Sequence, residues 1–190
     1  MNIGMSQLNQ VCLSNNIGSS EYINWYAAFV TTGDEDNVKA RLDYKFSHKI
    51  EVFVPKRILR ERKNGNWHNV IRPMFPGYIL IKGKIDLADF CEYKNIPNLL
   101  KLLHDENEIL SIPEHEIDAI SNLMNNGEII GPSNVLEAGR NVQIIDGPLC
   151  GMEANILSIN RRKGRAKVKI PFLGQDKIVE LSIKIVDEKH

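Results

Sequence analysis

The sequence lacks the features of several protein classes. Its three cysteines, Cys12, Cys91 and Cys150, form no C-x-x-C pair, which argues against a disulfide framework and against a cysteine-rich zinc site. No apolar run approaches the about 18 to 20 residues that span a bilayer. The first 20 residues also lack the basic start and apolar centre of a signal peptide. We therefore expect a cytoplasmic protein with no membrane partner.

Enzyme motifs are missing as well. The sequence contains no G-x-x-x-x-G-K-[ST], G-x-G-x-x-G, G-x-S-x-G or H-E-x-x-H. His104 beside Asp105, and His115 between Glu114 and Glu116, come nearest to a metal or acid–base cluster, but surface histidines explain them more simply. We expect a protein that is not an enzyme and has no metal or cofactor.

The chain carries no net charge, because 24 basic and 24 acidic side chains cancel over its 190 residues. Any electrostatic function must therefore be local. A hydrophobic content of 43% and a charged content of 25% suit one globular domain or two small ones. Residues 135–190 hold ten basic and seven acidic side chains, so this part is locally basic.

The first part of the chain alternates between strands and helices, after a polar stretch at residues 1–21 that we interpret as a flexible extension. Val38, Leu42 and Phe46 recur at helical spacing and predict an amphipathic helix. Two pairs have capping-box spacing at predicted helix starts, Thr32 with Glu35 and Ser111 with Glu114. The other expected elements are a strand at 25–30, a strand and hairpin at 51–71 turning at Asn64-Gly65, a strand after Pro76-Gly77, a short helix at 86–93, a strand at 96–103 and a helix that begins after Ser111 with Pro113 in its first turn.

The composition changes after residue 127. Residues 128–134, with Gly131-Pro132-Ser133, have the composition of a linker between domains. Short strand candidates separated by glycine-containing turns follow, which is typical of a small β-barrel. The candidates are residues 141–145, 154–159, 165–170, 177–181 and 183–186.

Phe75 and Tyr78 flank a Pro-Gly turn in R-P-M-F-P-G-Y-I-L-I. A rigid corner that presents two large rings suits pockets on a partner protein. Aromatic residues beside a strand also commonly belong to the core, and the residues alone leave both interpretations open.

Two segments are strongly basic. Residues 56–68, K-R-I-L-R-E-R-K-N-G-N-W-H, combine five cations and one acid with Trp67 and His68, which suits single-stranded nucleic acid as well as a solvated hairpin. Residues 161–169, R-R-K-G-R-A-K-V-K, hold six cations and no acid, and alternation places the charges of the strand part on one face. We expect a phosphate-binding surface there, a solubilising strand face being the alternative. Its cations are Arg161, Arg162, Lys163, Arg165, Lys167 and Lys169.

The chain resembles the NusG family of transcription elongation factors in W-Y-A-A-F, R-P-M-F-P-G-Y-I-L-I, I-P-N-L-L-K-L-L, I-P-E-H-E-I-D-A-I, A-G-R-N-V-Q-I-I-D-G-P-L-C-G-M-E-A-N-I-L and P-F-L-G-Q-D-K-I-V-E-L. The resemblance runs from about residue 24 to residue 186. It implies an α+β fold: a NusG-type N-terminal α/β sandwich domain with an antiparallel sheet at 22–127, and a KOW-type small β-barrel at 135–190 on a flexible tether.

The resemblance also implies partners. In the family, the aromatic turn and the end of the first strand bind the clamp helices of RNA polymerase, and the hairpin side faces the non-template DNA strand. Carried onto this sequence, the polymerase-binding residues are Phe29, Phe75, Pro76 and Tyr78, and the DNA-binding residues are Arg60, Arg62, Lys63, Trp67 and His68.

Three features favour a specialised bacterial paralog that resembles the LoaP antiterminators: the polar extension, the basic strand and an altered loop. Where general family members have I-F-G-R for contacts with ribosomal protein S10 or Rho, this chain has Phe172, Leu173, Gly174 and Gln175. Ala154 likewise stands where the KOW element commonly has glycine. We expect a monomeric antitermination factor whose barrel binds structured nascent RNA.

Two alternatives remain open. A general NusG-type adaptor would use the loop with Phe172 and Leu173 to bind S10 or Rho, with little affinity for RNA. A ribosome-associated KOW protein would bind ribosomal RNA even without Phe75 and Tyr78.

Overall fold

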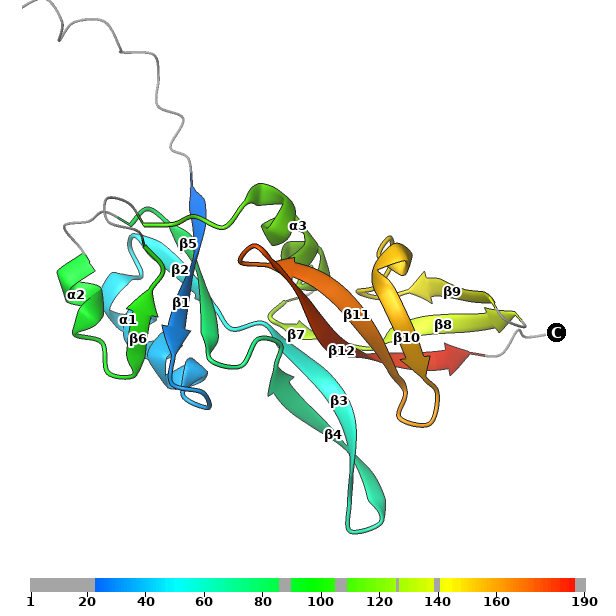
Figure 1. Ribbon diagram of the computed structural model, residues 1–190. Coiled ribbons are helices and arrows are strands. Elements are labelled where there is room, and N and C mark those ends of the chain that lie inside the picture. The colour runs from blue at the N-terminus through cyan, green and yellow to red at the C-terminus, as the bar shows by residue number, and fades with distance from the viewer. Residues whose placement is uncertain (1–22, 86–89, 105–108, 126, 139–140, 187–190) are drawn as a thin grey trace, which may run out of the picture.

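The computed structural model describes residues 23–85, 90–104, 109–125, 127–138 and 141–186. Figure 1 shows an N-terminal region (residues 23–130) beside a C-terminal region (residues 133–186). The expected extension at 1–21 and part of the expected helix at 86–93 lie outside the described residues.

The N-terminal region is built on an antiparallel four-stranded sheet with the order β2-β5-β1-β6. Alternation along the first strand divides its side chains between two faces. Tyr26, Ala28 and Val30 belong to a core with helix α1, whereas Ala27 belongs to a second core on the other face. The elements are β1 (Asn24–Val30), α1 (Glu35–Phe46), β2 (Ile50–Phe53), β5 (Tyr78–Gly83), α2 (Phe90–Lys94) and β6 (Leu99–Leu102).

The helices form where the apolar spacing predicts them, but neither capping box is present. Val38, Leu42 and Phe46 are buried along α1, as predicted. This helix begins only at Glu35, and its N-cap makes no side-chain hydrogen bond to the backbone. Helix α3 (Glu114–Leu123) likewise begins one residue after Pro113 without a side-chain cap. Both predictions of a capping box were wrong because each glutamate lies at the first helical position.

The basic hairpin forms as predicted from Asn64-Gly65, whose φ angles are 52° and 84°. It consists of β3 (Lys56–Lys63) and β4 (Asn66–Pro73). The expected linker at 128–134 differs from the tether that the resemblance implies. It contains β7 (Ile129–Ile130), which pairs in parallel with the start of β3, and Ile130 is buried. The division into domains at this segment stays a prediction.

The C-terminal region is a five-stranded sheet with the order β10-β11-β12-β8-β9. The two expected strands at 177–181 and 183–186 are one continuous strand, β12 (Gln175–Val186). Strand β8 was not predicted; it begins inside the expected linker and pairs in parallel with β12. The remaining elements are β8 (Ser133–Ala138), β9 (Asn141–Asp146), the short 3-10 helix η1 (Glu153–Asn155), β10 (Ile156–Asn160) and β11 (Arg165–Phe172).

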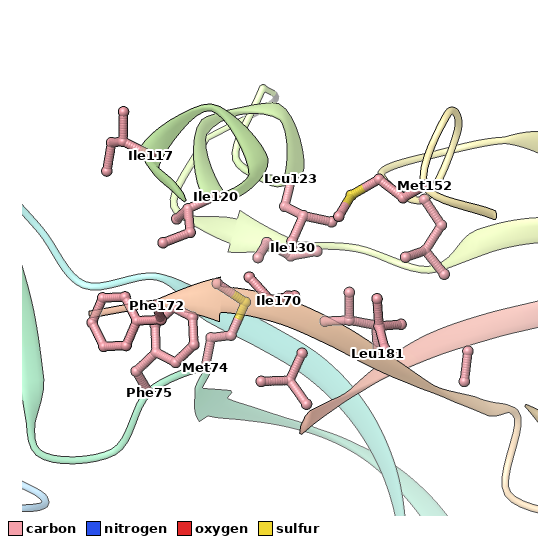
Figure 2. Packing of buried hydrophobic residues seen from close by; sticks show 14 of the residues in the cluster. Met74, Phe75, Ile117, Ile120, Leu123, Ile130, Met152, Ile170, Phe172 and Leu181 are labelled. Atoms are coloured by element: carbon pink, nitrogen blue, oxygen red, sulfur yellow. The ribbon is translucent and has the colours of Figure 1, made fainter. Parts of the chain in front are cut away.

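One hydrophobic core joins the two regions. It contains Ala27 and Leu80 of the first sheet, Ile120 of α3, and Val168 and Ile170 of β11. Figure 2 shows α3 lying over this cluster, with Phe75 and Phe172 meeting at one side. Since burial of apolar surface is the main favourable term in association, this shared core holds the two regions together.

Candidate functional site

The predicted polymerase-binding residues gather at one end of the first sheet. Phe29 on β1 is in register with Tyr78 on β5, and their ring centroids lie 4.4 Å apart. Pro76 is exposed, Tyr78 is half-buried and Phe75 is 6% exposed. The structure therefore brings all four residues into one place, which we call the aromatic patch (Phe29, Phe75, Pro76 and Tyr78).

The turn in this patch is fixed by a glutamate that the sequence analysis assigned to a capping box. Glu35 accepts hydrogen bonds from the Gly33 amide at 2.9 Å and from the Gly77 amide at 2.8 Å. Gly77 has a φ of +82°, and a Cβ added there would lie 3.0 Å from Thr32 Oγ1. A glycine is therefore needed between Pro76 and Tyr78 to present the rings on both sides of the turn.

The C-terminal region covers part of the aromatic patch. The Phe172 ring stacks on Phe75 with centroids 4.2 Å apart and an interplanar angle of 8°. It also meets Tyr78 edge-on at 5.2 Å. Both geometries are favourable for aromatic pairs. Figure 2 shows the rings of Phe75 and Phe172 lying against each other. The predicted polymerase-binding surface and the loop with Phe172 and Leu173 thus pack against each other.

A second buried glutamate holds the same loop. Glu116 of α3 is 3% exposed. Its carboxylate accepts hydrogen bonds from the Leu173 amide at 2.6 Å and the Gly174 amide at 2.9 Å. Charge-assisted hydrogen bonds of this kind are stronger than neutral ones. One feature of the sequence indicates this role, an acid beside the apolar stripe of the predicted helix at I-P-E-H-E-I-D-A-I.

A polar seam continues the contact along β3 and β12. Arg57 donates a hydrogen bond to the Glu180 carbonyl at 2.9 Å, and Ser182 Oγ donates to the Ile58 carbonyl at 2.5 Å. Arg165 forms an ion pair with the Glu180 carboxylate at 2.6 Å and donates to the Arg60 carbonyl at 2.6 Å. Burial between the regions lowers the pKa of the Arg57 guanidinium.

The predicted DNA-binding residues lie on the outer part of the hairpin. Arg60, Arg62, Lys63, Trp67 and His68 are all exposed. The Arg60 guanidinium lies 5.2 Å from the centre of the Trp67 ring, a cation–π contact. The structure therefore brings these five side chains together on one hairpin.

The single acid of the hairpin is neutralised locally. Arg72 on β4 contacts both carboxylate oxygens of Glu61, at 3.2 and 2.9 Å. Hydrogen bonding from this guanidinium holds the pKa of Glu61 below its ordinary value. The carboxylate therefore stays ionised and paired at neutral pH, so it does not oppose the cations toward the hairpin tip.

The predicted RNA-binding residues divide into two groups. Arg161, Arg162 and Lys163 are exposed at the turn between β10 and β11. Lys167 and Lys169 are exposed on β11, whereas the alternate residues Ala166, Val168 and Ile170 are buried, so the predicted alternation is confirmed. Arg165 differs from this prediction because its side chain is used in the seam.

The described residues contain no group of three or more His, Cys, Asp and Glu side chains that could hold a metal ion. None of the helices in the described ranges is long and apolar enough to cross a membrane. The described part of the chain thus consists of a mixed α/β region and a β-rich region, with an aromatic patch and basic side chains at the surface.

The comparisons with known proteins give the family. The family model described as "Transcription termination factor nusG" matches residues 23–121, which is more than half of the chain. The chain therefore belongs to the NusG family, and it is a transcription termination/antitermination factor of the NusG type. This assignment confirms the resemblance at the level of the family and of the α+β fold.

Two curated relatives and one solved structure illustrate the likeness. The chain is 25% identical over 175 residues to the transcription termination/antitermination protein NusG of Pseudomonas aeruginosa, covering 86% of this chain and 97% of that protein. The NusG of Escherichia coli K12 is 26% identical over 172 residues, covering 86% and 95%. A structure described as "Domain interaction in Thermotoga maritima NusG" has a TM-score of 0.54 at 20% identity and covers 84% of this chain and 93% of that one.

Proposed function

We propose that the protein is an antitermination factor of the LoaP type that docks on the clamp helices of RNA polymerase through the aromatic patch. In the docked state, its C-terminal region binds structured nascent RNA and its hairpin faces non-template DNA. One observation carries the docking part of this proposal: the aromatic patch already binds another apolar surface, the Phe172 loop. A patch that packs so closely on one partner can accept a second apolar partner when the first leaves.

This arrangement makes docking conditional. Phe75 is 6% exposed while Phe172 covers it, so the polymerase and the C-terminal region compete for the same rings. The apparent affinity for polymerase is then reduced by the fraction of molecules in which the regions are apart. Separation also frees the C-terminal region to act away from the N-terminal region.

The RNA part of the proposal is supported by the exposed turn at Arg161, Arg162 and Lys163 and by Lys167 and Lys169 on β11. An A-form hairpin presents a major groove too narrow for side chains, so we expect contacts with phosphates and loop bases. Each neutralised phosphate adds roughly 0.7 to 0.9 to the log–log slope of affinity against salt.

Docking is tested by pull-down of polymerase with Phe29→Ala, Tyr78→Ala and the matched control Tyr44→Ala, whose ring is 93% exposed on α1. Phe29 is the sharper test, because its ring contact is with Tyr78 rather than with Phe172, so its removal leaves the covering stack in place. Truncation of a hot-spot ring commonly costs about 2 to 4 kcal/mol of binding. Unchanged binding by folded Phe29→Ala and Tyr78→Ala would exclude the patch as the docking surface.

RNA binding is tested by salt titrations of a labelled RNA hairpin. Replacement of Arg161, Arg162 and Lys163 by alanine should lower the salt slope by about two to three units if each contacts a phosphate. A variant with Lys45→Ala, Lys84→Ala and Lys101→Ala, three exposed lysines of the N-terminal region, controls for net charge. Absence of RNA binding, together with capture of S10 or Rho, would instead support the general adaptor. Co-sedimentation with ribosomes despite loss of Phe75 and Tyr78 would support the ribosome-associated alternative.

A further inference from the structure

The packed arrangement brings two basic clusters together that are far apart in the sequence. Arg165 lies at the start of β11, directly after the basic turn that contains Arg162 and Lys163. Its guanidinium donates a hydrogen bond to the carbonyl of Arg60, in the middle of β3, at 2.6 Å. The C-terminal turn therefore starts next to the hairpin strand that carries Arg62 and Lys63.

The order of contacts shows that both turns extend in the same direction. Along β3, Arg57 contacts Glu180, the next residue contacts Ser182, and Arg60 contacts Arg165. Ser182 pairs with Arg165, so this series proceeds along the C-terminal sheet toward the β10–β11 turn. It proceeds along β3 toward the hairpin tip. Figure 1 shows the tip of β3 and β4 and the β10–β11 turn on the same side of the molecule.

The charges at this junction are unbalanced in favour of cations. Glu61 is paired with Arg72, and Glu180 is paired with Arg165. Exposed cations lie on both turns, namely Arg60, Arg62 and Lys63 on the hairpin and Arg162 and Lys163 on the C-terminal turn.

The hairpin adds an aromatic ring beside these charges. Trp67 is 39% exposed and carries the Arg60 guanidinium near its ring. Cations that follow a backbone, together with a ring on which a base can stack, are the features that bind single-stranded nucleic acid.

We propose that the two turns form one RNA-binding surface while the regions are packed. The RNA hairpin contacts Arg162 and Lys163, and its single-stranded flank crosses to Arg62, Lys63 and Trp67. This inference rests on the proposed RNA-binding role of the C-terminal turn. When the aromatic patch binds polymerase and the regions separate, the N-terminal hairpin leaves the RNA and becomes available to DNA, while the C-terminal turn keeps the RNA hairpin.

The experiment titrates the full chain with a fluorescent RNA hairpin that carries a single-stranded uridine tail. Combined Arg62→Ala and Lys63→Ala should weaken binding on the order of tenfold and lower the salt slope by about one to two units, as expected for two lost phosphate contacts. The matched pair Lys84→Ala and Lys101→Ala removes the same charge elsewhere and should change neither value. An RNA hairpin without the tail should bind with equal affinity to wild type and to the variant with Arg62→Ala and Lys63→Ala.

The dependence on packing is tested by repeating the titration with Phe172→Ala, which opens the contact. The effect of the Arg62 and Lys63 substitutions should disappear in that background. Glu116→Ala provides a second opening variant if Phe172→Ala fails to fold. If the Arg62 and Lys63 substitutions weaken RNA binding equally in the opened protein, the composite surface is wrong, because the β3–β4 hairpin would then bind RNA by itself.

The remaining outcomes separate this inference from the proposed function. One outcome is that Arg162→Ala and Lys163→Ala weaken RNA binding while the variant with Arg62→Ala and Lys63→Ala has wild-type affinity. In that case the composite surface is wrong and the proposed RNA role of the C-terminal turn stands. If wild type does not bind the RNA at all, both are wrong.

Discussion

The aromatic patch and the basic turns respond in opposite ways to the packing of the two regions. Phe75 is 6% exposed and stacks on Phe172, whereas Arg62, Lys63, Arg162 and Lys163 stay exposed. The same contact therefore covers Phe75 of the aromatic patch and leaves the cationic surface open. A single equilibrium between packed and separated regions can control access to a protein partner without closing access to nucleic acid.

Removal of the Phe172 ring should have the largest effect on access to the aromatic patch. The ring is fully buried, and truncation of a buried phenylalanine commonly costs about 3 to 5 kcal/mol. We expect Phe172→Ala to separate the regions, which small-angle scattering detects as a larger radius of gyration, and to increase polymerase affinity. Circular dichroism must show that the C-terminal sheet remains folded. A folded variant that is as compact as wild type would contradict the covering role of Phe172.

Glu116→Ala should have a smaller effect of the same sign. It removes the acceptor of two amide hydrogen bonds, and hydrogen bonds to a charged group contribute about 1.5 to 3 kcal/mol each to stability. Water replaces part of this loss once the loop opens. We expect faster hydrogen exchange at the Leu173 and Gly174 amides. The exposed neighbour Glu114 provides the control, and equal exchange in Glu116→Ala and Glu114→Ala would exclude a role of Glu116 in holding the loop.

Ser182→Ala should have the smallest effect of the three. It removes one hydrogen bond to the Ile58 carbonyl, and a neutral hydrogen bond contributes about 1 kcal/mol. We expect slightly weaker packing of the regions, which appears as a modest shift in the denaturant midpoint of their separation. Ser158→Ala on β10, an exposed serine outside the seam, should leave that midpoint unchanged. If Ser182→Ala lowered the denaturant midpoint as much as Glu116→Ala does, the seam would contribute more than one hydrogen bond at this position.

Local patterns predicted much of the fold. The spacing of Val38, Leu42 and Phe46 identified α1, and Asn64-Gly65 identified the hairpin turn, because each pattern follows from geometry within a few residues. The alternation along β11 was also correct. These features required no knowledge of distant parts of the chain.

The errors arise where distant contacts override local signals. We predicted separate strands at 177–181 and 183–186, but the hydroxyl of Ser182 between them finds an acceptor on β3, and β12 continues through this residue. Ile130 follows a linker-like composition, yet pairing with β3 incorporates it into a sheet. The contact of Phe75 with Phe172 joins residues nearly a hundred positions apart, and no local pattern indicates that these two rings meet.

The central claim is that polymerase docking and the packing of the two regions use the same face of Phe75 and exclude each other. The most direct measurement is the nuclear Overhauser effect between the Phe75 and Phe172 rings, whose centroids are 4.2 Å apart, in protein labelled at phenylalanine. We expect this signal in the free protein and its loss when the clamp-helix fragment of polymerase is added. A signal that persists in the saturated complex would contradict the claim, because both partners would then occupy the protein together.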